Sequence, residues 1–321
     1  MASGTEPIAA CTVEKNEIYN AVNDTYDAGA IYIGASKFKG VGNVFKNNYI
    51  HDIYLTEDAK GGATVGLYWD DQVSGQTAFG NIFDDNSLGM LVGGGDWNTV
   101  DNNIFYKTRA SLTYDNRGHG WQAGSATNLV SQYESEVGVS NALWQNTYPY
   151  TKTLYEYAKA GDLEKINAPD RAVVKNNLSI EAPNFDLAQA VKDNAKEVSN
   201  NIKVSGDYIK FADSDNYDFT YSADEKIKDI PDFEYIDFSE IGIEKKQLGK
   251  TQILSPKNGA ENVEGNCAVL SWKDTNGADR YRVRVYMYSD NTAMVYDNTV
   301  TGTSVDLDHL MRSQALFEDA P

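Results

Sequence analysis

The chain has 321 residues, enough for two domains, and 41% of them are hydrophobic, enough for a buried core. Asp and Glu outnumber Lys and Arg by 47 to 28, so the formal net charge is -19. Such a surface repels polyphosphates and anionic lipids, so we expect no nucleic-acid partner, and the lack of an apolar run of about 18 residues predicts no membrane insertion.

The ends and the cysteines carry little information. Cys11 and Cys267 lie far apart in the sequence and form neither a disulfide framework nor a zinc-binding pattern, so we interpret them as idle thiols. The opening residues, MASGTEPIAAC, lack the basic and apolar regions of an export signal. We expect any export segment to lie outside this chain.

Short strand-like segments repeat from the start of the chain. One series is NEIYNA (16–21), NYIHDI (48–53), NIFDDN (81–86) and NIFYKT (103–108). A second series is AIYIG (30–34), GLYWD (66–70), GMLVG (89–93) and SLTYD (111–115). Short strands at roughly this period, joined by Gly and Asn turns, are typical of a parallel β-solenoid, in which each coil buries its apolar face on the next.

Asparagines recur just before these strands. We interpret them as structural corner residues, because Asn tolerates left-handed backbone geometry and stacked amides can hydrogen-bond along the axis. The residues concerned are Asn43, Asn47, Asn48, Asn98, Asn102 and Asn103.

A long excursion, residues 117–171, interrupts the repeat. Within it, Leu154, Tyr155 and Leu163 predict a short helix packed on the solenoid. Long insertions on a rigid scaffold commonly shape binding sites. Two more strand segments follow, AVVKNNLSI (172–180) and NIKVSGDYIKF (201–211). We therefore assign residues 1–249 to a solenoid, and expect its N-terminal coils to be truncated.

Residues 250–321 have a different pattern, with alternating strands between turn signals. The segments LSW and YRVRVY resemble those of a fibronectin type III domain. Such a sandwich needs about seven strands and about 100 residues. We therefore expect an incomplete sandwich with an unpaired edge.

Aspartates end two strands of the second series. Alternate side chains of a strand face opposite ways, so aligning the apolar positions directs Trp69 and Tyr114 into the coil and Asp70 and Asp115 outward. Strands two coils apart are roughly 9–10 Å from each other. The coil between them offers only GGG (93–95), so the alignment predicts an open floor between the two carboxylates.

Such a layout suits an inverting glycosidase, whose acid and base have carboxyl groups about 6.5–9.5 Å apart. Asp71 could raise the pKa of Asp70 by like-charge repulsion, and Asp71 is itself the reserve candidate for the acid. The competing interpretation is that these aspartates are ordinary turn residues at solenoid corners.

Several motifs carry a resemblance to known proteins. They are DAGAIYIG (27–34), NNYIHDI (47–53), GLYWDDQVSG (66–75), LVGGGDWNTVDNNIF (91–105), YDNRGHGW (114–121) and DFSEIGI (237–243). On these motifs, residues 11–245 resemble right-handed parallel β-helix (pectate-lyase-like) proteins that act on carbohydrate, in particular glycoside hydrolase family 141, with its fucosidase and xylanase activities. The resemblance implies a pair of catalytic aspartates on neighbouring coils, which Asp70 or Asp71 and Asp115 match.

The loop after Asp115 adds further candidates. Arg117 could bind a sugar hydroxyl or pair with Asp115, and Trp121 could stack on a sugar ring. A loop salt bridge and buried packing are the alternatives. His51 lies in the other strand series, where a lone His is more often structural. The candidate substrate-binding residues are Tyr32, His51, Tyr68, Arg117, His119 and Trp121.

Together these features predict a monomeric, exported or cell-surface glycoside hydrolase acting on a plant or microbial polysaccharide or oligosaccharide. A polysaccharide lyase on the same fold, or a non-catalytic carbohydrate-binding or adhesin solenoid, are the alternatives. We expect no cofactor. Asp84, Asp85 and Asp96 could offer oxygen ligands to calcium, although they form no calcium-binding motif.

Overall fold

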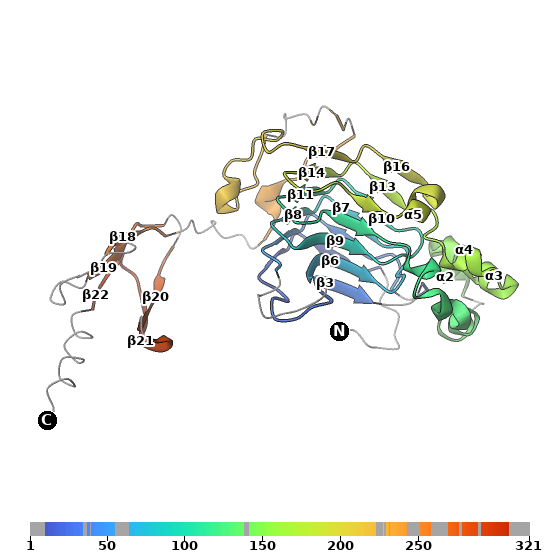
Figure 1. Cartoon of the computed structure of the whole chain (residues 1–321), viewed down its shortest axis with the longest axis horizontal. Helices are drawn as coiled ribbons and strands as arrows, with labels where there is room; N and C mark the ends of the chain where they lie inside the picture. The colour runs from blue at the N-terminus through green and yellow to red at the C-terminus, as the bar shows by residue number, and fades with distance from the viewer. Residues whose placement is uncertain are drawn as a thin grey trace, which may run out of the picture. The chain divides into compact units, whose positions relative to one another are not determined.

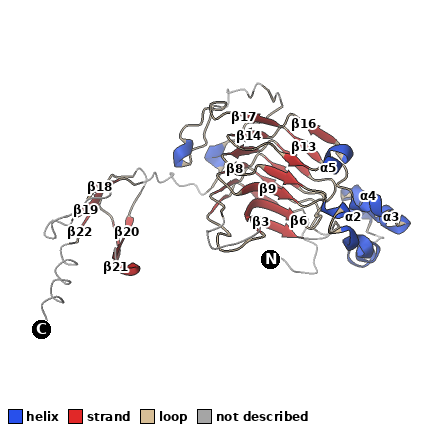
Figure 2. Ribbon diagram, in the orientation of Figure 1, coloured by secondary structure: helices blue, strands red, loops and turns tan. Residues whose placement is uncertain are grey.

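The computed structural model divides into two compact units, Met1–Ile243 and Glu244–Pro321. Strands dominate, and the longer helices gather at one side of the first unit (Figure 2). Among the residues that the structure describes, no helix is long and apolar enough to cross a membrane. The described residues are 10–34, 37–38, 40–54, 64–137, 141–222, 227, 229–230, 232–242, 251–257, 269–275, 278–287 and 290–307.

The first unit is an all-β solenoid whose strands stack coil on coil in three parallel sheets (Figure 1). Sheet A contains β1 (Thr12–Glu14), β4 (Val44–Lys46), β7 (Thr77–Phe79), β10 (Thr99–Asp101), β13 (Val173–Lys175) and β16 (Glu197–Ser199). Sheet B contains β2 (Glu17–Tyr19), β5 (Tyr49–His51), β8 (Ile82–Asp84), β11 (Ile104–Tyr106), β14 (Leu178–Ile180) and β17 (Ile202–Val204). Sheet C contains β3 (Ala28–Gly34), β6 (Thr64–Asp70), β9 (Leu88–Val92), β12 (Leu112–Tyr114) and β15 (Asp186–Leu187). The stacked parallel strands that the sequence repeats predict are confirmed.

Asparagines hold the corners between sheets A and B together. Asn81 donates from its backbone N and its Nδ2 to Oδ1 of Asn103, at 3.0 and 2.9 Å. Asn48 donates to Asn81 in the same way, at 3.1 and 2.9 Å. The ladder runs in order through Asn16, Asn48, Asn81, Asn103, Asn177 and Asn201. The structural interpretation of the corner asparagines is therefore confirmed for Asn48 and Asn103.

The excursion forms short helices rather than one. It contains η1 (Arg117–His119), η2 (Ala123–Asn128), α1 (Leu129–Gln132), η3 (Tyr133–Val137), α2 (Ala142–Thr147), α3 (Pro149–Ala160) and α4 (Leu163–Asn167). Leu154 and Tyr155 of α3 are buried in a cluster with Phe38 and Tyr133, as predicted. Leu163 is 51% exposed, because it begins α4 instead of belonging to the packed face of α3.

The predicted strand at 201–211 is wrong beyond Val204. After β17 the chain leaves the coil as residues 205–222, which we call the strap, with the short helix η4 (Ser214–Asn216) inside it. Ile209 and Phe219 of the strap pack on Tyr49 and Tyr106 of sheet B, and together they form a second apolar cluster outside the coil. The structure also contains α5 (Gln189–Asn194) between β15 and β16, and η5 (Phe238–Glu240) after the strap.

The second unit contains two small antiparallel sheets. One is formed by β18 (Ile253–Ser255), β19 (Val269–Trp272) and β22 (Ser304–Asp306), the other by β20 (Tyr281–Met287) and β21 (Asp290–Val300). The strands predicted at LSW and YRVRVY are confirmed, and Trp272 is 5% exposed. The described residues show these small sheets and not a seven-stranded sandwich, so the fibronectin-like fold stays a prediction.

Candidate active site

The candidate site lies where β6, β9 and β12 end in sheet C. Trp69 pairs with Val92, and Val92 pairs with Tyr114, in the register that the sequence predicts. All three side chains are 0% exposed inside the coil. Asp70 directly follows Trp69, and Asp115 directly follows Tyr114. The two aspartates therefore lie at the same corner of the solenoid, two coils apart.

The sequence predicts an open space between the two aspartates, and this prediction is wrong. The side chain of Arg117 fills that space. Its Nε and Nη2 donate to Oδ2 of Asp115 at 3.0 and 2.8 Å, and its Nη1 donates to Oδ1 of Asp70. The guanidinium group lies over Gly93, where an added Cβ would be 2.3 Å from Arg117 Cζ. The glycine therefore makes room for a side chain of the protein.

Arg117 is held in this position by strong electrostatics. Burial by itself would lower the pKa of Arg117, but the hydrogen bond and charge of Asp115, a hydrogen bond with Tyr68 and the charge of Asp70 outweigh it and raise that pKa above its ordinary value. The side chain of Arg117 is only 6% exposed. It is a permanent cation that joins two carboxylates in a planar, fork-shaped geometry.

Asp70 is more enclosed than its outward direction suggested. The hydroxyl of Tyr32 donates to its Oδ2 at 2.7 Å, and the backbone N of Asp71 donates to its Oδ1 at 2.8 Å. Together with Arg117 these partners leave the Asp70 side chain 10% exposed. The Asp115 side chain is 33% exposed, so it is much the more accessible of the pair.

Asp71 lies at the surface in a strained turn. Asp71 and Gln72 both have left-handed backbone geometry, with φ of 49° and 60°. The corresponding corner of the next coil uses Gly94 and Gly95, with φ of 72° and 81°. Two successive non-glycine residues in this conformation cost free energy, and such strain often occurs at functional sites.

The carboxyl group of Asp71 has the environment of a proton donor. Its partial burial and the negative charge of Asp70 raise the pKa of Asp71 above its ordinary value. The Nε2 of Gln122 donates to Asp71 Oδ1 and acts in the opposite direction. Gln122 was missed by the sequence analysis, since nothing in the spacing of the loop indicated that it would fold back onto the corner.

Aromatic rings surround the carboxylates. Trp121 is 76% exposed, and the Cζ of Arg117 lies 5.5 Å from the centre of its ring system. Tyr32 is 41% exposed and meets the ring of Tyr68 edge to face, with centroids 5.1 Å apart. The hydroxyl of Tyr68 donates to Asp27 Oδ1 at 3.1 Å. The structure thus places Tyr32 on Asp70, Trp121 beside Arg117, and Tyr68 beside Tyr32, and their role in binding a substrate stays a prediction.

The two histidines do not join this group. His119 points its Nε2 toward the backbone O of Glu164 in α4, at 2.9 Å, and so ties the loop to the excursion. His51 lies in sheet B, stacked between Tyr19 and Tyr49 with ring centroids 5.0 and 4.2 Å away. Its Nδ1 is 2.8 Å from Oδ2 of Asp52. His119 therefore connects the loop to the excursion, and His51 belongs to another sheet.

Two of the acids considered as calcium ligands, Asp84 and Asp96, have different protein partners. Asp84 accepts a hydrogen bond of 2.9 Å from the hydroxyl of Tyr49 in sheet B, whereas Asp96 is paired with Lys37 Nζ at 2.7 Å. Among the described residues, no group of three or more His, Cys, Asp or Glu side chains is arranged to hold a metal ion.

Comparisons of the chain with protein-family models, with curated proteins and with solved structures give no match.

Proposed function

We propose that the protein is an exported glycoside hydrolase on a right-handed parallel β-helix, similar to family 141, that cleaves a neutral glycan at the corner after β6 and β12. The observation that supports this is the combination of accessible carboxylates, Asp71 and Asp115, with the exposed indole of Trp121. An indole beside acids gives a sugar ring an apolar face to lie on while its glycosidic oxygen meets a proton donor.

In this proposal Asp71 is the general acid and Asp115 the general base. Burial and the charge of Asp70 raise the pKa of Asp71, which favours the protonated form that a general acid needs. Asp115, oriented by Arg117, activates a water on the opposite face of the sugar. Asp70 is a positioning residue, because it accepts hydrogen bonds from Arg117 Nη1 and from the backbone N of Asp71. Residues two coils apart suit the inverting arrangement, which needs about 6.5–9.5 Å between carboxyl groups.

The lyase alternative is less favoured by the geometry. A lyase takes a proton with a basic side chain next to a uronate, and the one arginine of this site is bound by two carboxylates. Because its pKa is raised, Arg117 is a poor base. A uronate would also meet the carboxylates of Asp70 and Asp115, which share the single positive charge of Arg117.

A non-catalytic glycan-binding site is the second candidate function. It is favoured by one observation: Arg117 already occupies the gap between Asp70 and Asp115. A buried ion-pair network of this kind can serve only to hold a loop in place, with Trp121 and Tyr32 forming a binding surface.

Release of reducing ends from a panel of neutral and uronate-containing glycans tests these alternatives. We expect hydrolysis of a neutral glycan, and a loss of roughly 10²–10⁴-fold in kcat for Asp71→Asn and for Asp115→Asn. Asp186→Asn is the matched control, since Asp186 is exposed in β15 of the same sheet. Unchanged turnover in both site variants would exclude the proposed mechanism. Glycan binding without hydrolysis would favour the second candidate, and an unsaturated, ultraviolet-absorbing product would indicate a lyase.

A further inference from the structure

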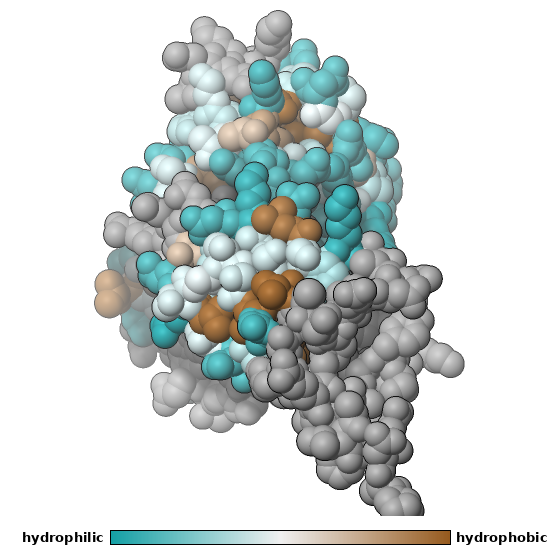
Figure 3. All heavy atoms as spheres, turned by 90° about the vertical axis from the view of Figure 1, so that its left-hand side faces the viewer, coloured by the Kyte–Doolittle hydropathy of each residue, from teal (hydrophilic) through white to brown (hydrophobic). Residues whose placement is uncertain are grey.

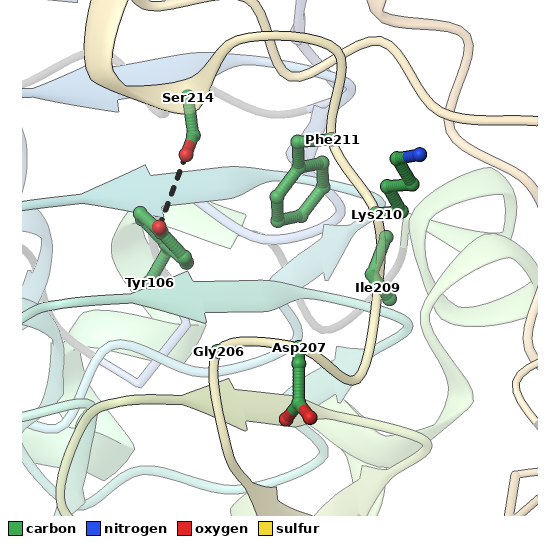
Figure 4. Close-up of a pocket in the computed structure, with 7 residues that line it drawn as sticks. All are labelled: Tyr106, Gly206, Asp207, Ile209, Lys210, Phe211 and Ser214. Carbon is green, nitrogen blue, oxygen red and sulfur yellow. Dashed lines mark hydrogen bonds between the residues drawn. The ribbon is translucent and has the colours of Figure 1, made fainter.

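A pocket lies on sheet B, on a different face of the coil from the acidic site of sheet C. It has a volume of about 320 Å³, and its side chains come from Tyr106, Asp207, Ile209, Lys210, Phe211 and Ser214 (Figure 4). Tyr106 ends β11, whereas the other five residues belong to the strap. The pocket exists because the chain leaves the coil after Val204 and passes over sheet B.

One wall of the pocket is apolar and fixed. The rings of Tyr106 and Phe211 meet edge to face, with centroids 5.6 Å apart and an angle of 85°. Phe211 packs in turn on Phe219, with centroids 4.8 Å apart, and Ile209 is 2% exposed. Because these side chains are held by the apolar cluster under the strap, the wall is present before any ligand arrives.

Figure 4 shows the hydroxyl of Ser214 turned toward Tyr106, whereas Asp207 and Lys210 extend from the chain toward the edge of the pocket, away from the two rings. The hydroxyls of Ser214 and Tyr106 are 3.0 Å apart, and each can still exchange a hydrogen bond with a ligand. Asp207 supplies a carboxylate whose orientation is set by the hydroxyl of Ser205. Lys210 supplies an ammonium group at the rim. The pocket therefore offers donors, acceptors and an aromatic wall within one small space.

This combination selects for a neutral, hydroxyl-rich ring. Asp207 and Lys210 carry opposite charges, so the lining of the pocket has no net charge of its own with which to select an ion. The described surface in Figure 3 mixes hydrophilic side chains with small apolar patches. The volume is at the lower end of small-molecule pockets, about 300–1,000 Å³, and thus admits a single ring.

We propose that this pocket binds one sugar unit of a neutral glycan, as a second carbohydrate site separate from the acidic cluster. The proposal rests on the proposed function for the identity of the ligand, because a chain that cleaves a polymer gains affinity when it holds that polymer at a second point. It does not depend on which residues carry out hydrolysis.

Chemical protection of Lys210 tests the pocket directly. The full chain carrying Asp71→Asn, so that the probe is not consumed, is acetylated with limiting reagent in the presence of xylotriose, cellotriose or N-acetylchitotriose. Mass spectrometry then gives the acetylation rate of each lysine. We expect at least one trisaccharide, well above its Kd, to slow acetylation of Lys210 by roughly threefold or more. Lys203, exposed on the neighbouring β17, is the internal control and keeps its rate.

Variants separate binding in the pocket from non-specific protection. The double variant Asp207→Asn, Ser214→Ala, which leaves the apolar wall intact, should abolish the protection, whereas Asp193→Asn on α5 should preserve it. No protection by any trisaccharide, equal protection of Lys203, or full protection in the double variant would each overturn the proposal. Reducing-end release by the unmodified chain is measured separately. Activity without protection of Lys210 would overturn only the proposed pocket. Protection of Lys210 without activity would overturn only the proposed hydrolysis.

Discussion

The guanidinium group of Arg117 occupies the space that a side chain at Gly93 would need, since a Cβ at position 93 would be 2.3 Å from Arg117 Cζ. Gly93 is not among the residues with positive φ, so alanine is compatible with its backbone. Position 93 therefore controls the arginine without belonging to the acidic cluster itself.

Gly93→Ala should displace Arg117 from Asp70 and Asp115 while the solenoid stays folded. The obstacle is the end of a long, flexible side chain, so the arginine can give up its ion pairs with Asp70 and Asp115 without a shift of the backbone. We expect kcat to fall by about 10-fold or more, because the base loses its orientation. Circular dichroism should remain unchanged. Gly124→Ala, where an added Cβ meets nothing within 4 Å, is the control and should keep full activity. Full activity in Gly93→Ala would show that the Arg117 bridge is irrelevant to catalysis.

Asn81→Ala tests the corner ladder as a source of stability. Asn81 is 0% exposed, accepts two hydrogen bonds from Asn48 and donates two to Asn103. Truncation removes the acceptor of the backbone N and Nδ2 of Asn48 and one of the two donors to Asn103, which should lower the free energy of unfolding by about 2–4 kcal/mol in urea titration. Asn194→Ala, on the exposed face of α5, should change it by less than about 0.5 kcal/mol. Equal effects of the two variants would contradict the ladder as a stabilising element.

Asp84 should make the stability of the solenoid depend on pH. Burial in sheet B raises the pKa of Asp84 from 3.8 to about 7, although the hydroxyl of Tyr49 opposes this. The folded state then binds more protons than the unfolded state between about pH 4 and pH 7, so this group makes the free energy of unfolding fall as the pH rises through that window. The loss should be on the order of 2–4 kcal/mol.

Urea titrations at pH 4, 5.5 and 8 measure this contribution as the difference between the wild type and Asp84→Asn. The variant should be less sensitive to pH across the window. His51, Asp52 and Asp85 are the titratable neighbours that also act on Asp84, and they remain in both proteins. A variant with the same pH dependence as the wild type would assign the effect to other groups.

The sequence predicted what depends on local periodicity. The inward positions of Trp69, Val92 and Tyr114 and the amides of Asn48 and Asn103 repeat with the coil, so their register could be read from the chain. The pairing of Arg117 with Asp115 was among the predicted alternatives and is confirmed. Its second ion pair, with Asp70, could not be read from the chain, because it needs a loop folded against α4: a Cβ at Gly118 would lie 2.2 Å from the backbone O of Asn167. Such contacts are set by tertiary packing.

The strap was missed for a related reason. NIKVSGDYIKF alternates like a strand, but Gly206 sits against the Glu181 side chain, where a Cβ would be 2.1 Å from Oε1. The apolar side chains after it pack on the outside of sheet B instead of inside another coil. Alternation alone does not distinguish these two surfaces.

Gln122→Met should shift the pH profile of hydrolysis upward. A general acid must be protonated, so activity falls as the pH rises through the pKa of Asp71. The amide of Gln122 donates to the ionised form of Asp71 and thereby lowers that pKa, against the larger effects of burial and of Asp70. Methionine keeps the volume and the burial but cannot donate, so the pKa of Asp71 should rise further. The alkaline limb of kcat against pH should then move to higher pH, while kcat on its acidic plateau stays within about twofold.

Asp71→Asn supplies the reference, since it should lose this limb together with most of the activity. A limb that stays in place or moves to lower pH in Gln122→Met would remove Asp71 from the role of acid and leave Asp70 or another group to fill it.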